Sequence, residues 1–128
     1  MKKQKPQCAF KDDRGEITDI LKREPVEYVT VITSKKGAVR GNHYHKETVQ
    51  FNYVVSGRMQ LLTQNPGEKT CSTILEPGDL AMTPAEERHT LIALEDSTLM
   101  VFTRGPRGGE DYEKDTYRLP TPLRIEGI

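Results

Sequence analysis

Tryptophan is absent from this chain of 128 residues, and cysteine and histidine are rare, with two and three copies. Cys8 and Cys71 are too few for a disulfide framework and do not form a Cys-x-x-Cys pair. We interpret them as free thiols, with a bridge between the two as the alternative. No apolar run approaches the roughly 18 residues that a membrane-spanning helix needs, and the apolar stretch near Met1 is too short for a secretory signal. These absences favour a soluble cytoplasmic protein without a membrane partner.

An excess of either charge is also missing, because 19 lysines and arginines balance 19 aspartates and glutamates. A balanced chain creates no overall field that would draw it to nucleic acid or to an anionic surface. Its length suits one domain with one core. We therefore expect no nucleic-acid partner, and a small-molecule ligand has to be argued from a local site.

Helical periodicity is lacking between residues 26 and 103, where short runs of β-branched and aromatic residues alternate with turn signals. Asn65-Pro66-Gly67 and Glu76-Pro77-Gly78 are two of these signals. Strands are expected at 26–33, 39–45, 49–56, 59–63, 70–75, 80–83, 89–94 and 98–103. This spacing is typical of an all-β sandwich or barrel. We predict one domain over 1–128, with a barrel core at about 26–103 and a C-terminal extension at 104–128, extended or briefly helical, that covers one end of the barrel.

All three histidines stand where a barrel could gather them. His43 and His45 are two residues apart, which in a strand places both imidazoles on one face. A change of direction at residues 46–47 could return Gln50 to the same interior, and His89 follows a turn that contains proline. Three imidazoles and an amide oxygen suit Zn²⁺, Fe²⁺, Mn²⁺, Co²⁺ or Ni²⁺, with positions left for water or substrate. We predict that His43, His45, Gln50 and His89 hold one divalent ion; two polar residues on a strand surface are the alternative for the His-x-His pair.

Two motifs with specific spacing resemble those of the cupin superfamily. The first comprises Gly37, His43, His45, Gln50 and Gly57, and the second comprises Gly78, Pro84 and His89. The resemblance implies a small cupin, which is a jelly-roll barrel or double-stranded β-helix. Gln50 stands where the family usually has Glu, which removes a negative charge and would make a bound ion more electrophilic. Glu86 stands where a Gly is usual, and Ala93 where an Asn is usual.

A narrower resemblance concerns sugar chemistry. The segment 40–46 with Gln50 is similar to nucleotide-sugar 3,4-ketoisomerases, and the stretches 13–15 and 36–44 resemble nucleotide-sugar 3,5-epimerases. The resemblance implies His43 and His45 as catalytic groups and Arg40 as a binder of the diphosphate or sugar. Asn52 and Phe102 replace a Lys and a Tyr expected in the epimerases, which favours ketoisomerase-like chemistry. Members of both groups work without an essential metal.

Arg40 raises a geometric question, because an odd neighbour of His43 in a regular strand faces away from it. Gly41 makes a bulge possible, and a bulge would turn Arg40 toward the same interior. The alternative is that Arg40 lies on the surface or reaches a partner chain. The glycine-rich segment 104–109 is a candidate phosphate-contacting loop, with a solvated loop as the alternative.

Cupins carry out many reactions, so three functions stay open. The first is isomerisation or epimerisation of a keto sugar, linked to a nucleotide. The second is a metal-dependent dioxygenase or a sugar-acid-converting enzyme, and the third is a non-catalytic binder of small molecules. We also expect a homodimer, because the extended N-terminal segment through Phe10 and Ile17 is available to pair with a neighbour.

Overall fold

The computed structural model describes residues 1–106 and 114–125, and over these ranges the chain forms strands and turns without a helix. Within these ranges there is accordingly no helix that is long and apolar enough to cross a membrane. The strands are β1 (Lys2–Gln4), β2 (Cys8–Asp12), β3 (Gly15–Thr18), β4 (Tyr28–Ser34), β5 (Val39–Tyr44), β6 (Val49–Ser56), β7 (Met59–Gln64), β8 (Cys71–Leu75), β9 (Leu80–Thr83), β10 (Arg88–Ala93), β11 (Ser97–Arg104) and β12 (Tyr117–Arg118).

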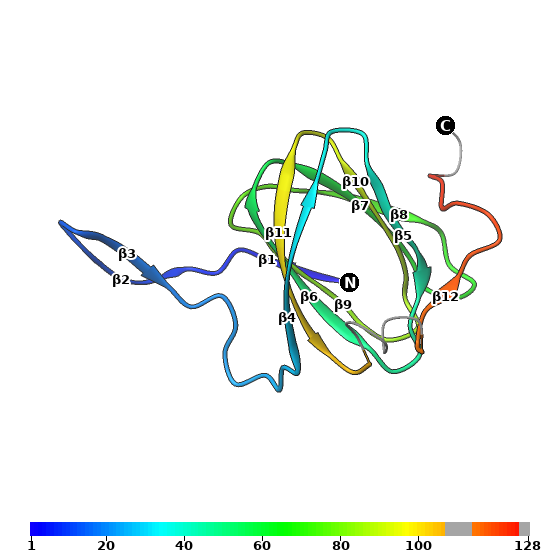
Figure 1. Ribbon diagram of the computed structural model, residues 1–128, viewed down its shortest axis with the longest axis horizontal. Coiled ribbons are helices and arrows are strands. Elements are labelled where there is room, and N and C mark those ends of the chain that lie inside the picture. Colours follow the sequence, from blue (N-terminus) through cyan, green and yellow to red (C-terminus); the bar gives the residue numbers. More distant parts are fainter. Residues whose placement is uncertain (107–113, 126–128) are drawn as a thin grey trace.

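Two antiparallel five-stranded sheets face each other and form the barrel (Figure 1). One has the order β1-β9-β6-β11-β4, and the other has the order β12-β5-β10-β7-β8. Inward-facing side chains from both sheets make the core, which comprises Val54, Met59, Leu61, Leu75, Ala81, Leu91, Ala93, Leu99 and Val101. The prediction of an all-β jelly-roll barrel is confirmed.

The eight strands β4 to β11 begin and end within two residues of the bounds expected from the sequence. Their turns use the predicted chemistry. In the turn before β9, Gly78 has a φ of 92° and the amide of Asp79 donates to the carbonyl of Glu76 at 2.9 Å. Proline at the first central position and glycine at the second are what this turn requires. Both cysteines are free thiols on the surface, as expected.

Four strands fall outside the expected set. β1 pairs with the edge of β9, and β12 pairs with β5. β2 and β3 form a hairpin that projects away from the barrel, at the left of Figure 1. Phe10 is 52% exposed on this hairpin and Ile17 is 60% exposed, so neither side chain is covered by the rest of the chain.

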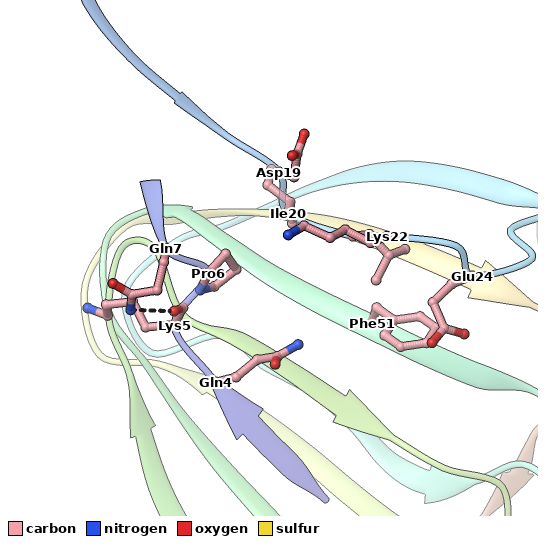
Figure 2. A pocket seen from close by; sticks show the side chains of 10 residues that line it. Gln4, Lys5, Pro6, Gln7, Asp19, Ile20, Lys22, Glu24 and Phe51 are labelled. Atoms are coloured by element: carbon pink, nitrogen blue, oxygen red, sulfur yellow. Dashed lines mark hydrogen bonds between the residues drawn. The ribbon is translucent and has the colours of Figure 1, made fainter. Parts of the chain in front are cut away.

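The N-terminal segments cross the outer face of the first sheet. Phe51 lies on this face, since its neighbours Gln50 and Asn52 line the barrel interior and side chains alternate along a strand. Residues 4–7 and 19–22, together with Glu24, border a hollow of about 400 Å³ above Phe51 (Figure 2). This cover leaves Phe51 only 7% exposed. Because the hollow lies on the other side of the sheet, it is separate from the interior.

Candidate active site and metal centre

A layer of polar side chains crosses the barrel near one end. The first sheet supplies Thr103, Gln50 and Thr83, which are paired in register on β11, β6 and β9. The second sheet supplies His43, His89 and Thr63, which are paired in register on β5, β10 and β7. All six side chains are buried. Since buried polar groups are costly in a core unless they find partners, this layer is the candidate functional site.

The three histidines meet in this layer. Their ring centroids are 4.7 Å apart for His43 and His45, 4.7 Å for His43 and His89, and 5.2 Å for His45 and His89. One nitrogen from each ring can be chosen so that all three lie within 4.8 Å of one another. Gln50 lines the same cavity as His43 and His89. The donor set therefore fits a divalent transition metal, with an amide oxygen available as a fourth ligand.

A β-bulge brings Arg40 to the same face as His43. His43 pairs with His89, but the register then shifts, so that Gly41 pairs with Thr90 and Arg40 with Leu91. Gly41 has a φ of 87°, and a Cβ there would lie 2.9 Å from the carbonyl oxygen of His89. Glycine is thus required at this position. Because His89 and Leu91 both face inward, their partners His43 and Arg40 do so too.

The cavity beside these residues has a volume of about 370 Å³. It is lined by Ile32, Val39, Arg40, Gly41, His43, Gln50, Asn52, His89, Leu91, Leu99 and Val101. Arg40 is its only charged lining residue in the described part of the chain. The Arg40 guanidinium donates from Nε to Ser34 Oγ at 2.7 Å and from Nη2 to the Thr33 carbonyl at 2.8 Å. It thereby bridges β5 and β4 at the mouth of the cavity, where it is exposed.

Backbone carbonyls orient two of the imidazoles. The Nδ1 atom of His45 lies 2.7 Å from the carbonyl oxygen of Asp115, and that of His89 lies 3.3 Å from the carbonyl oxygen of Glu87. A carbonyl oxygen can only accept, so each Nδ1 carries the proton. Nε2 is then the nitrogen that His45 and His89 can offer to an ion or a substrate.

Asp115 is a residue that the sequence interpretation missed. Its buried carboxylate accepts hydrogen bonds from the backbone amides of Lys46, Glu47 and Thr48, and also from the Thr48 hydroxyl. Burial by itself raises the pKa of the Asp115 carboxyl, but these bonds outweigh it and hold the pKa below its usual value. Asp115 stands in a polar stretch without a motif, so nothing in the sequence marks it.

Other residues singled out in the sequence lie in different places. Asn52 faces the cavity and donates to the Ala81 carbonyl at 3.0 Å, whereas Phe102 pairs with Phe51 on the outer face. Glu86, which replaces a usual glycine, has a φ of 72°. That left-handed conformation explains the family's preference for glycine. In the segment 104–109, Arg104 lies 3.4 Å from a carboxylate oxygen of Glu24, and residues 107–109 are outside the described ranges.

A match to a protein-family profile shows which family this chain belongs to. The profile described as "Cupin domain" matches residues 30–103, which is more than half of the chain. The chain belongs to the cupin family. In this cupin, the matched region contains His43, His45, Gln50 and His89.

Solved structures share the fold of this cupin. QdtA, a sugar 3,4-ketoisomerase from Thermoanaerobacterium thermosaccharolyticum in complex with TDP, has a TM-score of 0.76 and 20% identity, over 93% of this chain and 88% of that chain. A 3,4-ketoisomerase from Helicobacter canadensis has a TM-score of 0.76 and 22% identity, over 92% and 90%. A dTDP-4-dehydrorhamnose 3,5-epimerase from Sulfolobus tokodaii has a TM-score of 0.70 and 26% identity, over 84% and 71%. A comparison with curated protein sequences found no match.

Proposed function

We propose that this cupin isomerises or epimerises a keto sugar linked to a nucleoside diphosphate, with 3,4-ketoisomerase chemistry favoured. The observation that carries the proposal is one cavity with a histidine cluster at its inner end and Arg40 at its mouth. Similarity to sugar-modifying cupins supports it. QdtA has been solved with TDP, and a variant of it with TDP-4-keto-6-deoxyglucose.

The size of the cavity supports a binding mode in which only the sugar part of the substrate enters the barrel. At about 370 Å³ it is at the small end of the range of roughly 300–1,000 Å³ for ligand pockets. A single sugar ring suits this volume, and its nucleotide would lie outside. Arg40 also borders a second hollow of about 680 Å³, which Lys35 helps to line. In the proposal, Arg40 contacts the diphosphate while the sugar enters the barrel.

The chemistry needs only proton transfer. Moving a carbonyl by one carbon requires that a proton leave the neighbouring carbon to form an enediolate, that the proton of the neighbouring hydroxyl pass to the former carbonyl oxygen, and that a proton return to the former carbonyl carbon. Neutral imidazoles accept and donate protons near neutral pH. His43 lines the cavity and is assigned as the group nearest the reacting carbon. His45, whose ring centroid is 4.7 Å from that of His43, is assigned as its partner in the transfer.

The same side chains could hold a metal. His43, His45 and His89 would supply nitrogens, and Gln50 would supply an oxygen. A divalent ion so bound would act as a Lewis acid on a carbonyl or hydroxyl oxygen. The three-histidine cluster thus favours a second candidate function, a metal-dependent dioxygenase or sugar-acid-converting enzyme. A binder without catalysis is the third.

Two measurements separate these functions. Thermal unfolding with a panel of nucleotide sugars should show stabilisation by thymidine-linked keto sugars, because a ligand that binds only the native state raises its stability. A panel without any effect would contradict the first function. Metal analysis of protein purified without an affinity tag tests the second, which requires about one ion per chain.

We also propose that the protein forms a homodimer through the β2–β3 hairpin. A two-stranded hairpin without further packing is marginal in water, and this one leaves Phe10 and Ile17 exposed. The edge strand β4 exposes Val29 and Val31, which are 60% and 62% exposed. A second copy could cover both surfaces. Light scattering at tens of micromolar tests this, and a monomer would contradict it.

A further inference from the structure

Asp115 joins two parts of the chain that are far apart in sequence. It belongs to the C-terminal extension, just before β12, yet its side chain is only 4% exposed and lies against the turn between β5 and β6. Its carboxylate oxygens lie 3.0, 2.8 and 2.8 Å from the backbone nitrogens of Lys46, Glu47 and Thr48, and 2.9 Å from Thr48 Oγ1. Four donors on one carboxylate fix the position of the whole residue.

The main chain of the same residue contacts the candidate site. The Asp115 carbonyl accepts from His45 Nδ1 at 2.7 Å, which is a short bond for an N–H donor. The carboxylate therefore holds the turn, and the carbonyl holds the imidazole that immediately precedes that turn. The neighbouring strand β12 reinforces the arrangement, since Tyr117 pairs with Tyr44 and their rings stack with centroids 5.3 Å apart.

We infer that Asp115 is a positioning residue that fixes His45 in the Nδ1-protonated tautomer and directs its Nε2 toward His43 and His89. The inference rests on the proposed function only for its effect on activity. The tautomer itself is a property of the protein without ligand. Outer groups that orient an imidazole in this way typically alter metal affinity or activity by about 10- to 100-fold when they are removed.

The experiment measures the ring nitrogens of His45 by long-range ¹H–¹⁵N NMR, with ¹⁵N-histidine, at about pH 8, which is above the ordinary pKa of an imidazole, about 6.5. Only three histidines contribute signals, and the His45→Gln variant assigns the one of interest. We expect the wild type to show a protonated Nδ1 and an unprotonated Nε2. In Asp115→Ala, the two shifts should move toward an average of both tautomers. Asp115→Asn keeps one acceptor oxygen and should give a smaller change in the same direction. If Asp115→Ala does not fold, the tautomer measured in Asp115→Asn tests the inference.

Asp79→Asn is the matched control. Asp79 is 5% exposed and its carboxylate accepts from the amide of Glu76 at 2.8 Å, so it also holds a turn, but in a different part of the barrel. This variant should leave the His45 tautomer unchanged even where it lowers stability. An Nε2 proton in the wild type, or unchanged His45 shifts in both Asp115 variants, would overturn the inference.

Zinc titration and turnover separate this inference from the proposed function. We expect Asp115→Ala to weaken zinc binding or to lower kcat by about 10- to 100-fold, with KM for the nucleotide sugar nearly unchanged. A changed tautomer in a protein that never converts sugar would support the positioning role and contradict the proposed function. If instead the protein converts sugar but the His45 tautomer is the same in wild type and in both Asp115 variants, the proposed function is supported and the positioning role is contradicted.

Discussion

Arg40→Ala tests how the cavity recognises an anionic ligand. Arg40 is exposed and lies at the mouth, where its guanidinium bonds Ser34 and Thr33 and, among residues 1–106 and 114–125, pairs with no carboxylate. Its positive charge is therefore available to a diphosphate. A hydrogen bond to a charged group contributes about 1.5–3 kcal/mol, which corresponds to a loss of roughly 10- to 150-fold in affinity for thymidine diphosphate. Isothermal titration calorimetry measures this directly.

Arg58→Ala is the control for general electrostatics. The Arg58 side chain is 47% exposed, lies 3.8 Å from a carboxylate oxygen of Glu76, and does not line the cavity. Its loss should leave the affinity almost unchanged. Raising the salt concentration should weaken wild type more than Arg40→Ala, because salt screens the charge that the variant lacks. Equal affinity in wild type and Arg40→Ala would refute the assignment of Arg40, and absence of binding to either would remove the nucleotide-sugar function.

Three further predictions concern metal, assembly and pH. Tag-free protein loaded with Zn²⁺, Mn²⁺, Fe²⁺, Co²⁺ or Ni²⁺ should retain about one ion per chain, and the double variant His45→Ala with His89→Ala should retain none; a ratio near zero for wild type would contradict the metal site. Phe10→Ser with Ile17→Ser should shift a dimer toward monomer in light scattering, whereas an unchanged mass would exclude the hairpin as the contact. The folded-state pKa of Asp115 is lowered, so its stabilisation is complete above the unfolded pKa of about 3.9 and is lost as pH falls through the folded value. The difference in free energy of unfolding between wild type and Asp115→Asn, measured with urea, should thus shrink below about pH 4; a difference independent of pH would contradict the lowered pKa.

Most of the barrel could be predicted from local patterns. Alternating β-branched residues and the Pro-Gly turns define β4 to β11 within two residues. The polar strand β1 and the two-residue strand β12 could not be found in this way, because each forms only by pairing with the edge of an existing sheet. For the hairpin, the sequence predicts only an extended segment through Phe10 and Ile17.

Sequence spacing also anticipated part of the site geometry. The bulge at Gly41 turns Arg40 inward as that glycine suggested, and the turn after His45 returns Gln50 to the cavity. The position of Asp115 depends on hydrogen bonds to residues more than sixty positions away in the chain, the backbone amides of Lys46, Glu47 and Thr48. Local sequence carries no trace of such contacts.

The most direct test of the central claim is solvent exchange into the sugar. Wild type incubated in D₂O with TDP-4-keto-6-deoxyglucose should place deuterium on a carbon adjacent to the carbonyl and yield an isomerised or epimerised keto sugar, as followed by ¹H NMR. His43→Asn should slow this exchange by at least about 100-fold, which is the lower range for loss of a general acid or base. Absence of exchange and of product with folded wild type, or equal rates in wild type and His43→Asn, would contradict the account.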